Sequence, residues 1–278
     1  SLKKQPDAIP YITSYYNSRW GFCIKHKDKI KLIKNYKNND QFEVLIDSKF
    51  NNKGHLTYGE LILKGKTKQE ILISTYICHP SMANNELSGP IVSMSLINYF
   101  QKLKLKKTLR FIFIPETIGS IAYLSKNLSR IKKFTIGGYN LTCIGDEKNH
   151  SCMMSKYGNS ISDRSLIKAY KKLKINNYKI YSFLERGSDE RQFNSPGVDI
   201  PFTSIFRSKY GTFKEYHTSL DNFSLVTKRG VYGGFNVAKE AIKELLNQDI
   251  PIYRVICEPQ LGKKGLYPTI SQKENYKI

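Results

Sequence analysis

The sequence predicts an α/β protein built on a mostly parallel sheet that helices cover on both faces. Short apolar runs of strand length recur along residues 67–248, and segments with helically spaced apolar residues separate them. Strands that alternate with helices are typical of parallel sheets. Continuous apolar runs, rather than alternating ones, are typical of strands buried on both sides. We therefore expect one α/β domain over this stretch.

Four segments are expected to contain the strands, because each is short, apolar and ends in polar or turn-forming residues. They are residues 71–77, 108–114, 135–144 (one or two strands) and 201–206. Four segments are expected to be helices, because their apolar residues recur every three or four positions. They are residues 88–100, 118–128, 162–173 and 231–246. Ser88 is a good N-cap residue for the first helix, with Pro90 in its first turn.

The two ends of the chain differ from this pattern. Residues 1–66 contain alternating stretches at 42–47 and 55–63 that polar turns separate. Such stretches predict β-hairpins in a small β-rich accessory unit, and no helical spacing is evident before Pro90. Residues 249–278 are rich in turn-forming and polar residues, and we expect a tail or the start of a further domain there.

Composition places the chain among ordinary globular proteins. It has 278 residues, of which 40% are hydrophobic, with a mean hydropathy of -0.44. No apolar run is long enough to span a membrane, and the first residues lack the apolar core of a secretory signal. The five cysteines are scattered without a CxxC pair, which favours a reduced, cytoplasmic protein.

The formal net charge of +22 raises the alternative of nucleic-acid binding. The excess is mostly lysine, and it is spread along the chain instead of forming one block. Lysines at helix ends and on polar faces are ordinarily solvated. The basic segments also lack the interleaved aromatic residues of a platform on which bases stack. We therefore interpret the charge as a solvated surface and expect no nucleic-acid partner.

Polar residues follow several of the expected strands, where open α/β sheets bind ligands. His79 follows the first strand, Glu116 the second and Asp146 the third, and His217 lies in a later loop. Two histidines, an aspartate and a glutamate are suitable for a zinc hydrolase, with Glu116 as general base. Each residue also has an ordinary alternative role, as a structural histidine, a first-turn glutamate or a turn aspartate. Their order and placement together favour a site.

Several longer motifs carry a specific resemblance. They are Cys78-His79-Pro80-Ser81, Asn84-Asn85-Glu86-Leu87-Ser88-Gly89, Pro115-Glu116-Thr117-Ile118-Gly119-Ser120, Arg186-Gly187-Ser188-Asp189-Glu190-Arg191-Gln192-Phe193 and Glu215-Tyr216-His217-Thr218-Ser219. The series resembles the co-catalytic zinc aminopeptidases. It resembles more closely a bacterial aminopeptidase-like domain family that is often encoded near polysaccharide-biosynthesis genes. The resemblance covers roughly residues 6–267. It implies an insert unit before residue 67. It also implies that this chain lacks the first part of the family's catalytic domain and nearly all of its C-terminal winged-helix domain.

The resemblance also implies roles for single residues. His79 and Asp146 correspond to ligands of one zinc and His217 to a ligand of the other, while Glu116 corresponds to the general base. Asn85 and Thr117 stand where the two-zinc family has carboxylates. A neutral amide is a poor bridge between two cations, so we expect one zinc ion at most, with Glu86 as a replacement oxygen ligand. The side chains expected to contact the substrate are Asn85, Arg186, Asp189, Arg191 and Tyr216.

Two functions remain in competition at this level. The first is a metal-dependent hydrolase of aminopeptidase type that acts on a peptide or an N-acylated sugar. The second is a catalytically degenerate family member that binds a ligand without turnover, which the replacements at Asn85 and Thr117 favour. The sequence leaves the substrate, the metal and the oligomeric state open.

Overall fold

The computed structural model describes residues 1–13, 17, 19–47, 49, 51–249, 257 and 260–266. The chain divides into two units, Ser1–Asn247 and Gln248–Ile278. The described part of the second unit contains the 3-10 turn η3 (Leu261–Lys264). Most of the predicted tail or further domain at 249–278 lies outside the described residues.

A seven-stranded sheet forms the centre of the first unit, in the order β1-β3-β2-β4-β7-β5-β6. Its strands are β1 (Gly59–Leu63), β2 (Glu70–Tyr76), β3 (Thr108–Ile114), β4 (Thr135–Leu141), β5 (Ser151–Met153), β6 (Lys179–Tyr181) and β7 (Phe202–Phe206). The four central strands β3, β2, β4 and β7 pair in parallel. Antiparallel pairing occurs between β1 and β3 and between β5 and β7. The sheet is therefore mostly parallel, as the sequence predicts.

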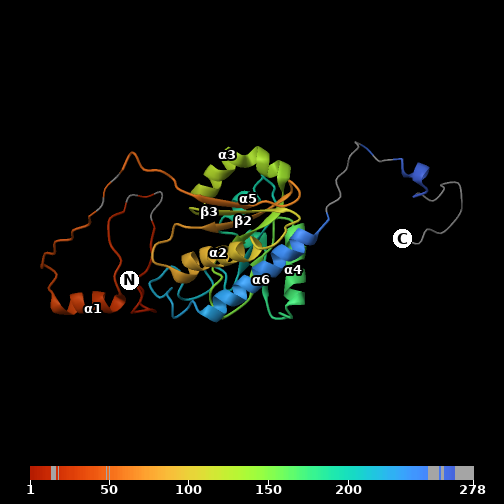
Figure 1. The fold of residues 1–278 in the computed structure, drawn as a ribbon. Helices are drawn as coiled ribbons and strands as arrows, with labels where there is room; N and C mark the ends of the chain where they lie inside the picture. Colours follow the sequence, from red (N-terminus) through yellow and green to blue (C-terminus); the bar gives the residue numbers. More distant parts are fainter. Residues whose placement is uncertain are drawn as a thin grey trace. The chain divides into compact units, whose positions relative to one another are not determined.

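Helices cover both faces of the sheet (Figure 1). On one face lie α2 (Ser88–Phe100), α4 (Ile161–Lys172) and α6 (Lys228–Asn247). On the other lie α3 (Ile118–Phe134) and α5 (Glu190–Phe193). In β2, Ile71 and Ile73 pack toward the first group, while Leu72 packs toward the second. Because successive strand residues point to opposite faces, an all-buried strand needs apolar residues on both sides, and β2 is buried throughout.

Three local expectations differ from the structure. The helix α3 continues to Phe134, six residues beyond the predicted end, and β4 ends at Leu141, earlier than predicted. Ser88 is not the N-cap of α2, because the π-helical turn η1 (Ala83–Leu87) precedes the helix directly. The Ser88 hydroxyl instead donates to the carbonyl of Asn84 at 2.5 Å and accepts from the backbone of Ile144 at 3.0 Å.

The separate β-rich unit at residues 1–66 stays a prediction, but the described residues there differ in detail from the predicted hairpins. Residues 41–47 form no strand, and the one strand before residue 67, β1, joins the main sheet beside β3. The chain also has a helix before Pro90, α1 (His26–Asn35). Alternation alone does not make a strand, because a strand also needs a neighbour to pair with.

The strand order predicts a crevice at the carboxyl ends of β2 and β3. The chain runs from β2 to β3 on one side and then returns to add β4 on the other side of β2. Such a reversal of strand order leaves a crevice outside the carboxyl ends of the strands. None of the helices among the described residues is long and apolar enough to cross a membrane.

Candidate functional site

His79 and Glu116 meet because their strands run in parallel and in register. Tyr76 at the end of β2 pairs with Ile114 at the end of β3, so the loops that follow begin side by side. The Nε2 atom of His79 lies 3.7 Å from Oε2 of Glu116. The prediction that these two residues lie together at the carboxyl edge of the sheet agrees with this geometry.

Glu86 connects η1 to the His79 loop. Its Oε2 accepts the backbone N–H groups of Cys78 at 3.1 Å and His79 at 2.7 Å, and lies 3.5 Å from Nδ1 of His79. The Cys78 sulfur lies 3.3 Å from the same Nδ1. Ligand atoms of Cys78, His79 and Glu86 all lie within 4.8 Å of one another. A thiolate, an imidazole and a carboxylate are the ligand types that zinc takes in proteins.

The His79 ring lies in an environment that attracts positive charge. Burial opposes charging of the ring, but hydrogen bonds to Cys78 and Glu86 and the negative charge of Glu116 outweigh it and raise the pKa of His79 to about 10. At neutral pH this environment favours the protonated ring. Since a metal ligand must be deprotonated, a cation that binds His79 here would displace this proton.

His217 approaches the same place from the loop before α6. The His217 ring lies 5.5 Å from the His79 ring, stacks on Tyr216 at 4.0 Å and meets the edge of Tyr11 at 5.1 Å, all between ring centroids. Its Nε2 atom is buried without a hydrogen-bond partner. Burial and the charge of His79 lower the pKa of His217 to about 4. His217 is therefore a neutral imidazole with an unsatisfied nitrogen, the form that binds metals.

Glu116 is held by residues at the start of α5. Ser188 Oγ donates to Glu116 Oε1 at 2.6 Å. The next backbone N–H, that of Thr117, donates to Asp189 Oδ1 at 2.7 Å, and Arg191 Nη2 donates to the Thr117 hydroxyl at 3.0 Å. Thr117 has a φ of 62°, which costs conformational energy for a β-branched residue, so these contacts hold a strained turn. Burial raises the pKa of Glu116, although the Ser188 hydrogen bond lowers it.

Asp189 and Arg191, both predicted to contact substrate, therefore have protein partners. Asp189 is fully buried, and burial together with the charge of Glu116 raises its pKa to about 7. Arg186 is exposed, lies over the Phe183 ring at 4.8 Å and donates to the Phe183 carbonyl at 3.3 Å. That Arg186, Asp189 and Arg191 contact the substrate stays a prediction.

Asn85 is buried and its side chain is occupied by protein groups. Its Oδ1 accepts from the Tyr76 hydroxyl at 2.7 Å and from the Cys143 thiol at 3.3 Å. The Tyr76 hydroxyl also hydrogen-bonds to Thr142, the residue that follows β4. The amide of Asn85, the phenol of Tyr76 and the hydroxyl of Thr142 thus lie together, with the Tyr76 ring next to His79. All three groups are neutral, whereas a second metal ion would need carboxylate ligands here.

Asp146, predicted as a zinc ligand, lies in a different environment from His79 and Glu86. Its carboxylate is fully buried and accepts four hydrogen bonds of 2.8–3.0 Å, from Asn84 Nδ2, the Lys148 backbone, and the Ser208 backbone and hydroxyl. Like His217, it is not part of the group formed by Cys78, His79 and Glu86. Because β4 ends at Leu141, Asp146 lies five residues beyond the strand.

Two further contacts were not predicted from the sequence. Asp221, four residues after His217, accepts the backbone N–H groups of Asn84 at 2.6 Å and Asn85 at 2.9 Å, which fixes the start of η1. Tyr11 lies beside both histidines, because residues 10–11 pair with the loop at 217–218. No local signal in the sequence predicts this long-range pairing.

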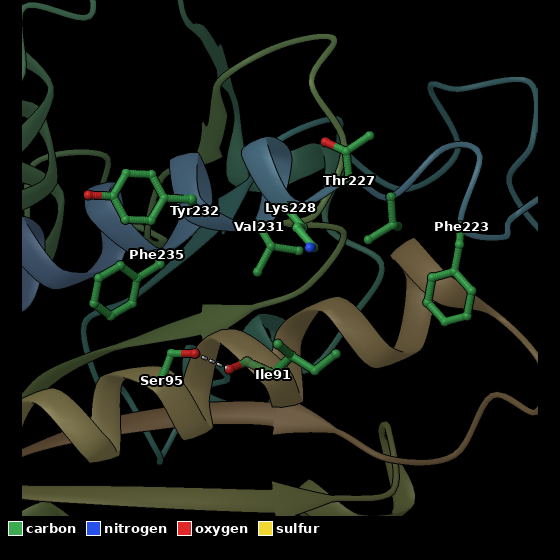
Figure 2. Close-up of a pocket in the computed structure, with 9 residues that line it drawn as sticks. Ile91, Ser95, Phe223, Thr227, Lys228, Val231, Tyr232 and Phe235 are labelled. Atoms are coloured by element: carbon green, nitrogen blue, oxygen red, sulfur yellow. Dashed lines mark hydrogen bonds between the residues drawn. The ribbon is translucent and has the colours of Figure 1, made fainter.

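The largest described groove is separate from this site. It has a volume of about 710 Å³ and lies between α2 and α6 (Figure 2). Its lining is mainly apolar, with Ile91, Phe223, Val231, Tyr232 and Phe235 among its residues, and it contains no carboxylate or histidine.

The sequence matches known protein families over most of its length. The family described as a domain of unknown function, DUF4910, matches residues 9–249. The chain belongs to the DUF4910 family. A model for a winged helix-turn-helix matches residues 251–278.

A Clostridium acetobutylicum relative, described as a polysaccharide biosynthesis protein with an aminopeptidase-like domain, is 40% identical over 97% of this chain. A crystal structure from the same organism, described as that of a candidate peptidase, is 39% identical, with a TM-score of 0.82 over 95% of this chain. The DUF4910 chain spans about 60% of the length of each.

A zinc aminopeptidase from Bacillus subtilis has the same fold, with a TM-score of 0.59 and 20% identity over 68% of this chain and 50% of its own. The predicted relation to aminopeptidase-like domains is confirmed.

Proposed function

We propose that this chain is a hydrolase of aminopeptidase type that uses one zinc ion to cleave a peptide or N-acyl amide bond. The main support is that His79, Glu86, Glu116 and His217 converge near the carboxyl ends of β2 and β3, where the strand order reverses. His217 brings a buried nitrogen without a partner, and the group around His79 brings nitrogen, oxygen and sulfur donors within 4.8 Å of one another.

The residues present fit a single zinc ion better than two. His79, Glu86 and His217 would hold the ion, with the Cys78 sulfur in reach of the same place. A bound zinc ion would supply Lewis acidity to a water molecule and to the substrate carbonyl. The neutral groups at Asn85, Tyr76 and Thr142 argue against a second ion beside it.

Glu116 has the features of a general base. Ser188 fixes one of its oxygens, while the other faces His79 across 3.7 Å. Burial raises its pKa, which makes the carboxylate a better proton acceptor near neutral pH. The bonds from α5 to the Thr117 turn keep the carboxylate oriented without using its second oxygen.

The second candidate is a catalytically degenerate binding protein. Asp146 favours it, because all four of its hydrogen bonds come from protein groups, and a buried carboxylate satisfied in this way serves the fold. The polysaccharide-biosynthesis role of the Clostridium relative makes a sugar-containing ligand suitable for either candidate.

The two candidates are separated by assaying the zinc-loaded protein against aminoacyl p-nitroanilides and N-acylated amino sugars. We expect hydrolysis by the wild type, and a loss of about 10²–10⁴-fold in Glu116→Gln with zinc affinity nearly unchanged. Glu244→Gln on α6 is the matched control and should keep wild-type turnover. Zinc binding without hydrolysis of any substrate would favour the degenerate candidate. Full turnover in Glu116→Gln would remove Glu116 as the base.

A further inference from the structure

The helix α1 is basic and amphipathic, and none of its residues is buried. Residues at i, i+3 and i+4 share a helix face, so Lys27, Lys31 and Lys34 form one row along α1. Ile30 and Ile33 form the adjoining row, with exposed fractions of 51% and 64%. An isolated helix of ten residues has little stability in water. A helix of this kind gains stability when its apolar side is covered.

Aromatic residues extend the apolar side of α1. Trp20 is 77% exposed, Phe22 56% and Phe42 57%. The Trp20 and Phe22 rings meet at 6.5 Å, and the Tyr36 and Phe42 rings at 4.9 Å, between centroids. Together with α1 they line an open groove of about 640 Å³. An exposed apolar patch of this kind, rimmed by lysines, marks an interaction site.

We infer that this face, defined as α1 with Trp20, Phe22 and Phe42, binds the surface of an anionic lipid bilayer. Helices that lie in the membrane interface combine lysines on the polar side with aliphatic and aromatic residues on the other, and tryptophan favours the headgroup level. The lysines complement lipid phosphates, and the net charge of +22 adds long-range attraction. Nucleic acid fits less well, because bases could stack on the exposed rings but a polyanion would leave the aliphatic residues Ile30 and Ile33 uncovered.

The chain contains a single tryptophan, so its fluorescence reports on this face alone. The test is titration of the full chain with vesicles of phosphatidylglycerol and phosphatidylcholine, and with vesicles of pure phosphatidylcholine. We expect a blue shift of Trp20 emission and co-sedimentation with the anionic vesicles, both weakened by salt. Neutral vesicles should give neither.

Two pairs of lysines provide matched variants. Replacing Lys31 and Lys34 by glutamine should lower the partition coefficient on anionic vesicles by about 30-fold, from the contribution of two lysines at a lipid surface. Replacing Lys104 and Lys106, exposed between α2 and β3, removes the same charge elsewhere and should leave binding close to the wild-type value. Ile33→Ser should also weaken binding. Because no α1 side chain is buried, the thermal unfolding midpoint should not change in any variant.

Four results would overturn the inference. The first is the absence of a blue shift with anionic vesicles, and the second is equal binding to neutral vesicles. The third is an equal loss of vesicle binding when Lys104 and Lys106 are replaced. The fourth is a blue shift that depends on protein concentration without vesicles, which would point to a second copy of the chain as the partner of this face. The measurement needs no metal and no substrate, so its outcome is independent of the proposed hydrolase function.

Discussion

Replacing Asp146 by asparagine should destabilise the fold and leave zinc binding intact. The carboxylate accepts four hydrogen bonds, two on each oxygen. An asparagine keeps one acceptor oxygen and places an NH₂ group at the other. In its better orientation the oxygen keeps the Asn84 and Ser208 backbone donors, and the Ser208 hydroxyl rotates to accept. The Lys148 N–H then loses its partner.

The cost follows from these contacts. One unpaired backbone donor costs about 1 kcal/mol when partly buried, and each of the three bonds that remain loses about 1 kcal/mol on changing from charge-assisted to neutral. The sum is about 4 kcal/mol, which a domain with about 5–15 kcal/mol of stability survives. Urea unfolding monitored by circular dichroism measures the loss in the free energy of unfolding, and calorimetric titration of the folded variant measures zinc affinity.

A neighbouring carboxylate provides the control for Asp146→Asn. Glu147 is exposed and pairs with Arg229 at 3.5 Å, so Glu147→Gln should change the free energy of unfolding by less than about 1 kcal/mol. If Asp146→Asn instead kept wild-type stability and lost zinc, Asp146 would be a metal ligand and the structural role argued from its hydrogen bonds would be wrong.

Three further predictions concern the surrounding structure. Asp189→Asn should remove the charge that accepts the strained Thr117 N–H and lower kcat by about tenfold or more with little change in KM, measured by steady-state kinetics; a change in KM alone would make Asp189 a substrate-binding residue. Burial and the charge of Arg207 lower the folded-state pKa of His150 to about 4 from 6.5, so the unfolded chain takes up the proton first. The wild type therefore loses stability through His150 as the pH falls from about 6.5 to 4. The free energy of unfolding of His150→Asn should depend less on pH over this window than that of the wild type, and an equal pH dependence would contradict this. Gly230→Ala should destabilise strongly, because its Cβ would lie 2.0 Å from the Gly145 carbonyl oxygen; a melting temperature equal to that of the wild type would contradict this close packing.

The sequence predicts the central elements well because burial on both faces leaves a clear apolar signal. The run at β2 is buried in every residue, and β3 agrees with its predicted bounds of 108–114. The same logic places His79 and Glu116 together, since both follow parallel strands in register.

The features that the sequence does not predict depend on contacts between distant segments. The stretch at 42–47 alternates like a strand but has no strand beside it in the described residues. In α1, lysines interrupt the helical spacing of the apolar residues. The role of Asp146 depends on Asn84 and Ser208, which are about sixty residues away on either side. Which donors surround a carboxylate cannot be predicted from its position after a strand.

The central claim is that one zinc ion binds where His79, Glu86 and His217 meet. The most direct test is elemental analysis of the protein after saturation with zinc and removal of excess metal, for the wild type and for His79→Ala and His217→Ala. We expect one zinc ion per wild-type chain and well under one per chain in each variant, because each substitution removes a ligand. Two zinc ions per chain, none, or one that survives both substitutions would contradict the claim.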